Sequence, residues 1–162
     1  MCVATTKRIP RTPLVRVQLI RESSVTYPIG DVMSGPKQIA YAARAILDSY
    51  DREAFICAHL NSKHMLVSME ITALGTLNAT LIHPREIYTG AILAKAAAIC
   101  LIHNHPSGRS EPSSEDIALT RQLMQAGEII GIRVIDHLIL GSDNSTSLRE
   151  TTDLWFNQAF HQ

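Results

Sequence analysis

A short apolar run that leads into two histidines is the feature that most constrains the fold of this chain. Residues 99–102 carry only apolar side chains, which predicts a buried strand in the interior of a sheet. Side chains at positions i and i+2 of an extended chain point the same way, so His103 and His105 can face one ion while Asn104 faces elsewhere. A proline and a glycine follow closely and end the strand.

A helix start comes after this strand and a short turn. Ser113 is a suitable N-cap residue, and Glu115 and Asp116 fall in the first turn, where the helix dipole favours negative charge. The apolar spacing beyond them predicts a helix that ends near Gly127. Asp116 would then add a carboxylate to the two imidazoles. Three protein ligands of these types leave a fourth position open for water, which is the arrangement of a catalytic zinc site.

Each half of this pattern also has a purely structural explanation. Composition alone gives roughly 0.3 chance occurrences of His-x-His in a chain with seven histidines. A serine followed three residues later by an aspartate is usually only a helix cap. The combination is much more specific, because the strand, the ligand pair, the turn, the cap and the carboxylate occur in a consistent order.

The pattern as a whole resembles the JAMM motif of the JAB/MPN metalloprotease family, and it is most similar to the RadC-like branch of bacteria. The resemblance extends over residues 37–160. Asn104 stands where the wider family commonly has Ser or Thr, and it fits the RadC-like branch. The segments that carry the resemblance are 75–79 (GTLNA), 83–87 (HPREI), 103–108 (HNHPSG), 112–120 (PSSEDIALT) and 136–141 (DHLILG).

This resemblance implies a fold, a cofactor and a reaction. The implied fold is α/β, with three layers in which a mixed sheet is flanked by helices, similar to the cytidine deaminases. The implied ligands of Zn2+ are His103, His105 and Asp116, and Ser113 matches the serine that supports the oxyanion in the family. Deaminase chemistry itself is excluded, because the sequence lacks the His-x-Glu and Pro-Cys-x-x-Cys motifs of that site.

The family also uses an upstream glutamate as general base, and three glutamates are candidates. Glu53 comes directly before an apolar strand at residues 54–58, as the family base does, and it is our choice. A solvated acid at a strand edge is the alternative for this position. Glu70 lies on the following strand and would reach the site only if the strand register allowed it. Glu86 follows Pro84 and is explained more simply as a first-turn helix acid.

The order of the predicted elements favours one domain with a short N-terminal appendage. Helices alternate with strands and one hairpin is included, so we expect a mixed sheet with helices on its faces. Residues 1–36 would form a basic arm and a strand, and residues 37–160 the RadC-like JAB/MPN domain. The predicted helices span residues 38–50, 84–98, 114–127 and 153–161, and the predicted strands span residues 15–19, 55–60, 65–73, 99–102 and 132–140.

Charge is unevenly distributed along the chain, although the net charge is zero. Five basic residues precede the first acid, Glu22, whereas the remainder holds ten basic and fifteen acidic residues. Such a basic arm can contact DNA or an acidic partner. The alternative, which we favour, is a solvated terminus, because Pro10 and Pro13 discourage a helix there.

Cysteine usage and hydropathy indicate the cytoplasm. Cys57 and Cys100 lie in apolar strands, which predicts buried, reduced core residues rather than a disulfide. No apolar stretch approaches the ~20 residues that a membrane-spanning helix needs. The N-terminus lacks both the amphipathic pattern of a transit peptide and the apolar core of a signal peptide. We therefore expect no targeting segment and no membrane partner.

Two further histidines belong to the shared segments. His83 precedes a predicted helix, and His137 interrupts an apolar strand. Each is expected to be a hydrogen-bonded structural residue rather than a ligand.

Three functions remain open from the sequence. The first is a zinc-dependent hydrolase of peptide or isopeptide bonds, with Glu53 as base and a peptide or protein as substrate. The second is a DNA-associated accessory protein that uses the basic arm. The helix-hairpin-helix-like segment that often precedes this domain in longer RadC proteins is not expected here, which weakens this second hypothesis. The third is a metal-stabilised scaffold without turnover, over which the intact ligand set favours the first. A homodimer is compatible with each.

Overall fold

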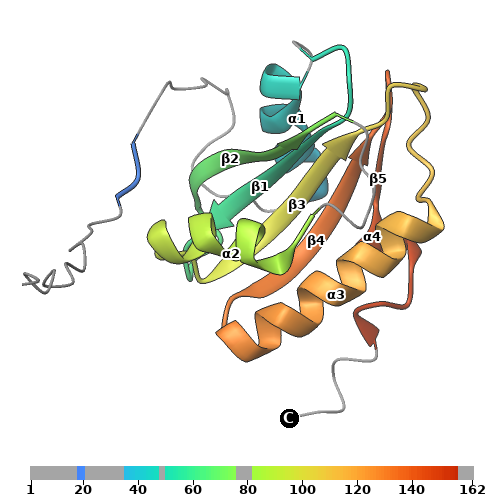
Figure 1. Cartoon of the computed structure of the whole chain (residues 1–162). Coiled ribbons are helices and arrows are strands. Elements are labelled where there is room, and N and C mark those ends of the chain that lie inside the picture. Colours follow the sequence, from blue (N-terminus) through green and yellow to red (C-terminus); the bar gives the residue numbers. More distant parts are fainter. Residues whose placement is uncertain (1–17, 21–34, 48–49, 76–81, 157–162) are drawn as a thin grey trace, which may run out of the picture.

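The computed structural model describes residues 18–20, 35–47, 50–75 and 82–156. Within these residues the chain folds into a five-stranded sheet with helices on both faces (Figure 1). In chain order the elements are α1 (Pro36–Leu47), β1 (Ala54–Leu60), β2 (Leu66–Leu74), α2 (Pro84–Leu93), β3 (Ala98–Asn104), α3 (Ser114–Ile130), β4 (Arg133–Leu140), β5 (Ser145–Ser147) and α4 (Leu148–Thr151).

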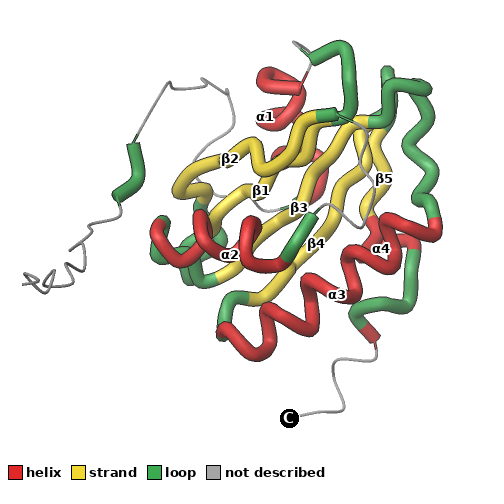
Figure 2. The backbone as a smooth tube through the Cα atoms, viewed as in Figure 1, coloured by secondary structure: helices red, strands yellow, loops and turns green. Residues whose placement is uncertain are grey.

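The strands lie in the order β2-β1-β3-β4-β5, so that β2 and β5 form the edges of the sheet (Figure 2). β1 pairs in antiparallel fashion with both β2 and β3, whereas β3 and β4 are parallel. A parallel pair needs a crossover connection, and α3 supplies it. β5 returns antiparallel to β4. The prediction of a mixed sheet is therefore confirmed.

Alternate side chains of the central strands fill two separate cores. On β1, Ile56 and Ala58 pack in the core that α1 covers, whereas Phe55 and Cys57 pack in the core under α2 and α3. Strands β1 and β3 are buried on both faces, which is why their sequences are continuous apolar runs. Cys57 and Cys100 are buried free thiols, as predicted. The expected three-layer architecture is confirmed (Figure 1).

Two helices differ in length from the prediction. α2 ends at Leu93 instead of continuing to the start of β3, because Lys95 takes a left-handed conformation (φ 54°) that turns the chain. α3 continues past Gly127 to a left-handed C-cap at Gly131 (φ 80°). Gly127 serves close packing instead, because a Cβ atom there would collide with the hydroxyl of Tyr88.

The elements predicted near the two termini lie only partly within the described residues. The terminal helix expected at residues 153–161 is wrong for residues 153–155, which form a bend and a turn after α4, whereas Phe156 has 3-10 helical geometry and residues 157–161 lie outside the described residues. Trp155 still joins the core by donating its Nε1–H to the carbonyl of Val134 at 3.1 Å. Residues 18 and 19 of the predicted strand at 15–19 are described and do not form a strand, whereas its residues 15–17 and most of the basic arm lie outside the described residues. In the described part of the chain, none of the helices has the length and apolar character needed to cross a membrane.

Candidate metal centre

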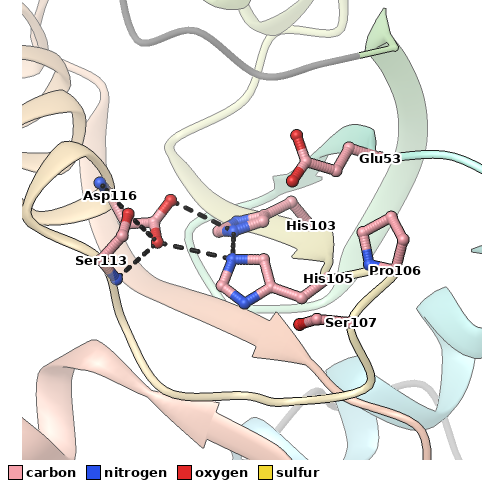
Figure 3. A pocket seen from close by; sticks show the side chains of 7 residues that line it. All are labelled: Glu53, His103, His105, Pro106, Ser107, Ser113 and Asp116. Atoms are coloured by element: carbon pink, nitrogen blue, oxygen red, sulfur yellow. Dashed lines mark hydrogen bonds and ion pairs between the residues drawn. The ribbon is translucent and has the colours of Figure 1, made fainter.

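The two histidines of the candidate site lie at the end of β3 and directly after it. The side chains of His103 and His105 lie on the same side of the chain and face α3 (Figure 3). Their Nε2 atoms are 2.9 Å apart. His103 is only 1% exposed and stacks on the ring of Phe55, with ring centroids 5.8 Å apart, whereas His105 is partly exposed.

The backbone beyond β3 is held against β4. The N–H of His105 donates to the carbonyl of Leu140 at 2.9 Å, and Nδ1 of the His105 ring lies 3.0 Å from the carbonyl oxygen of Arg109. Because a carbonyl oxygen only accepts, this second contact places a proton on Nδ1 and leaves Nε2 of the neutral ring as an acceptor. Gly108 (φ 78°) takes the left-handed conformation that lets the chain turn back here.

Asp116 approaches the histidines from the first turn of α3. Its Oδ1 lies 3.2 Å from Nε2 of His103, and its Oδ2 lies 3.6 Å from Nε2 of His105. Ser113 and Asp116 form a capping box, in which Oγ of Ser113 accepts from the N–H of Asp116. In return, the N–H and the hydroxyl of Ser113 donate to Oδ2 of Asp116 at 2.8 and 2.6 Å. The helix cap therefore also orients the carboxylate.

The ionisation of Asp116 suits a metal ligand. Burial by itself favours the neutral acid. The neighbouring His103 and the hydrogen bonds from Ser113 outweigh burial and hold the pKa of Asp116 well below its usual range. Asp116 is therefore a carboxylate at neutral pH.

The three side chains fit a zinc ion. In a tetrahedral site with bonds of ~2.0–2.2 Å, neighbouring ligand atoms are about 3.4 Å apart. The separation of 2.9 Å between the two Nε2 atoms, and those of 3.2 and 3.6 Å from these atoms to the two different oxygens of Asp116, lie around that value. All candidate ligand atoms lie within 4.8 Å of one another, and this is the one such group of His, Cys, Asp or Glu among the described residues. Two imidazoles and a carboxylate are also ligands that zinc commonly takes.

A cleft of about 410 Å3 opens over these side chains and brings all five predicted site residues together. Glu53 lies across the cleft from Asp116, with the two histidines between them (Figure 3). Glu53 immediately precedes β1, and its carbonyl accepts from the N–H of Gly75 at 2.8 Å. The cleft is lined by Glu53, His103, His105, Pro106, Ser107, Ser113 and Asp116.

The other two candidate bases lie elsewhere in the described structure, outside the set of residues that line the cleft. Glu70 lies on β2, where its carboxylate packs against Gly90 of α2 and is 3.8 Å from Nε2 of His59. Glu86 is an exposed acid in the first turn of α2, as predicted. The geometry therefore favours Glu53, whose catalytic role stays a prediction.

No pattern in the sequence indicated which side chains His137 contacts. This residue of β4 is completely buried, with Nε2 2.8 Å from Nδ1 of His103 and Nδ1 2.6 Å from Oγ1 of Thr120. Burial, reinforced by the neighbouring His103, holds the pKa of His137 well below its usual value. The expectation that His137 is a hydrogen-bonded structural residue is confirmed, but one of its two hydrogen-bond partners is His103, a candidate metal ligand. His83, by contrast, is exposed and makes no side-chain hydrogen bond at the N-cap of α2.

The architecture and the cleft together define a class of protein. It is an α/β domain in which the end of a central strand and the start of the next helix bring two histidines and an aspartate together. A family model described as the RadC-like JAB domain matches residues 33–153. The chain belongs to this RadC-like JAB family.

Curated relatives support the assignment to this family. The chain is 46% identical over 114 residues to a protein of Desulforamulus reducens, 44% over 119 residues to one of Moorella thermoacetica, and 38% over 138 residues to one of Alkaliphilus metalliredigens. These matches cover 70%, 74% and 85% of this chain, but only 50%, 52% and 60% of the relatives. Each relative is named "UPF0758 protein", a name that states no activity.

Proposed function

We propose that this chain is a zinc-dependent hydrolase that cleaves a peptide or isopeptide bond of a peptide or protein substrate. His103, His105 and Asp116 hold the metal, and Glu53 is the general base. The observation that carries the proposal is the arrangement of the cleft. A charged carboxylate and two imidazoles converge on one point, and a second carboxylate faces them from the other side (Figure 3).

The residues of the chain have separate tasks in this reaction. A zinc ion supplies Lewis-acid polarisation and makes water acidic enough to act as a nucleophile near neutral pH. The carbonyl of Arg109 keeps Nε2 of His105 available as a ligand atom, by accepting from Nδ1. Glu53 takes the proton of the attacking water and passes it to the leaving amine. Its partly exposed position before β1 leaves it accessible from the cleft.

Ser113 is proposed to support the oxyanion of the tetrahedral intermediate. Its hydroxyl donates to Oδ2 of Asp116 at 2.6 Å in the structure, so the hydroxyl has to rotate toward the substrate to act in this way. Asp116 then keeps the backbone N–H of Ser113, at 2.8 Å, as a donor to the same oxygen. The carboxylate therefore stays oriented while the hydroxyl changes partner.

A cytoplasmic location and the absence of a membrane partner are part of the proposal, which is compatible with a homodimer. The buried free thiols Cys57 and Cys100 support a reducing compartment. The alternative of a DNA-associated accessory protein depends on the basic arm, which lies outside the described residues. No contact within the described residues favours that alternative.

A cleavage assay with a broad peptide library tests the proposal. The zinc-loaded protein should cleave a subset of the peptides, and chelation should abolish the activity until zinc is restored. Glu53→Gln should lower turnover by about 100-fold or more at unchanged zinc content, because an amide cannot accept the proton of water. Glu86→Gln is the matched control, since it neutralises an exposed acid outside the cleft. Turnover that survives Glu53→Gln but is lost in Glu70→Gln would assign the base to Glu70.

A further inference from the structure

A continuous chain of buried hydrogen bonds connects two of the candidate ligands through the interior. Oγ1 of Thr120 lies 2.6 Å from the carbonyl oxygen of Asp116 and 2.6 Å from Nδ1 of His137. Nε2 of His137 then lies 2.8 Å from Nδ1 of His103. The side chains along this route are sealed from solvent, because Thr120 and His137 are 0% exposed and His103 is 1% exposed.

The rules of donors and acceptors fix the direction of every bond in this chain. The carbonyl oxygen of Asp116 can only accept, so the hydroxyl of Thr120 donates its single proton to that oxygen. Oγ1 of Thr120 must then accept from an N–H at Nδ1 of His137. In a neutral imidazole the other nitrogen is an acceptor, so Nε2 of His137 accepts from an N–H at Nδ1 of His103. Nε2 of His103 is thereby left with its lone pair toward the cleft.

The surroundings of His137 favour the neutral ring that this argument requires. The carboxylate of neighbouring Asp136 accepts from the backbone N–H of His137 at 2.7 Å, not from its ring. The imidazole ring itself has hydrogen-bond and ring contacts, among the described residues, with the Thr120 hydroxyl, the imidazole of His103 and the edge of Phe55, whose ring centroid is 5.4 Å away. None of these ring contacts supplies a negative charge. A doubly protonated ring would therefore be a buried charge without a hydrogen-bonded counter-ion, which is unfavourable.

We infer that Thr120 and His137 are positioning residues that fix the tautomer of His103 and so keep its Nε2 atom open to the metal. The inference rests on the proposed function, because it concerns the metal of that site. If the donor and acceptor of each of these hydrogen bonds were exchanged, Nε2 of His103 would carry a proton, which would lie between the ring and the ion. These hydrogen bonds begin at the backbone carbonyl of Asp116 in α3 and pass through His137 of β4. They therefore also connect Asp116 to His103 of β3.

Zinc affinity measured by chelator competition tests this role without an activity assay. Thr120→Val keeps the shape of the side chain but removes the hydroxyl, so the reversed tautomers of His137 and His103 are no longer disfavoured. Affinity should fall by about 10- to 100-fold, as is typical when a partner behind a metal ligand is lost. Thr120→Ser, which retains the hydroxyl, is the matched control and should stay close to the wild type. His137→Gln can carry an acceptor and a donor in the same order, and it should bind zinc better than His137→Leu.

The tautomer itself can be observed by 1H–15N NMR of the imidazole rings in the zinc-loaded wild-type protein. We expect His137 to carry its proton on Nδ1 and none on Nε2. This measurement needs no variant, so it holds even if Thr120→Val fails to fold. A proton on Nε2 of His137, or equal zinc affinity of Thr120→Val and Thr120→Ser, would overturn the inference and leave the proposed function intact. A wild-type protein that binds no zinc would overturn both.

Discussion

The side-chain amide of Asn104 holds the backbone on both sides of Glu53. Its Oδ1 accepts from the N–H of Ala54 at 2.7 Å, and its Nδ2 donates to the carbonyl of Arg52 at 3.0 Å. The residue between the two candidate ligand histidines therefore also positions the chain segment that carries the proposed base. The pairing of β3 with β1 therefore positions Glu53 relative to the two candidate ligand histidines.

Asn104→Ala should separate turnover from metal binding. The substitution frees the segment before β1, and a displacement of about 1 Å near a reacting group can cost about 100-fold in rate. We expect turnover to fall by about 10- to 100-fold while the zinc content stays the same. The matched control is Asn61→Ala, because the side chain of Asn61 also makes two hydrogen bonds to the backbone, accepting from the N–H groups of Lys63 and Met65 at 2.9 and 3.0 Å. Equal losses of turnover in both variants would show that Asn104 acts only through stability.

Ser113→Ala should affect both stability and chemistry. Loss of the helix cap should lower the free energy of unfolding by about 1 kcal/mol. Loss of the oxyanion donor should lower kcat by about 100-fold with saturating zinc. Ser114→Ala is the control, because Ser114 is exposed and its hydroxyl bonds only to neighbouring Glu115, at 3.0 Å. An undiminished kcat in Ser113→Ala would limit the role of this serine to capping α3 and orienting the carboxylate.

The burial of His59 leads us to predict a pH dependence of stability that does not involve the metal. Its side chain is 2% exposed, with Nδ1 2.9 Å from Oγ of Ser68, and burial lowers its pKa from 6.5 to about 4. Between these values the unfolded chain binds a proton at His59 that the folded chain does not, so stability falls as the pH drops through this window. The full effect should be about 1 to 3 kcal/mol. Neighbouring Glu70, whose pKa is raised by burial, offsets part of it.

Urea unfolding as a function of pH measures this effect. His59→Asn should flatten the profile between pH 6.5 and about 4 relative to the wild type. His64→Asn provides the comparison, because His64 is exposed and already has a left-handed backbone (φ 58°) that asparagine tolerates. Identical slopes for the wild type and His59→Asn would contradict the assignment.

The basic arm is expected to be dispensable for folding. The sequence before Leu14 has no clear apolar pattern, so little core should be lost with it. Deletion of residues 1–12 should leave the melting temperature nearly unchanged. If the arm binds DNA, the affinity should fall steeply as salt is raised. Binding that is independent of salt, or no binding, would remove the DNA-associated alternative.

The parts of the structure that could be predicted depend on local patterns. Strand alternation predicts that His103 and His105 share a side, and the helix start at Ser113 predicts where Asp116 lies; the structure has both features. The helix ends were less predictable. A left-handed non-glycine residue, Lys95, ends α2, and the glycine expected to end α3 packs against another helix instead.

The contacts behind the site could not be predicted, because they depend on register between segments distant in sequence. Asn104 reaches a backbone segment 52 residues earlier, and His137 reaches a histidine 34 residues before it. Only the pairing of β3 with β1 and β4 brings these groups together. A shift of one residue in either pairing would turn the side chains to opposite faces, and no local pattern encodes that register.

Elemental analysis of the purified protein tests the central claim most directly. The wild type should contain about one zinc per chain, because two histidines and an aspartate complete a three-ligand site. The His103→Ala, His105→Ala double variant should contain almost none, while His64→Ala, His83→Ala, which removes two exposed histidines, should match the wild type. Circular dichroism should show that both double variants are folded. Full zinc content in the His103→Ala, His105→Ala protein would contradict the account.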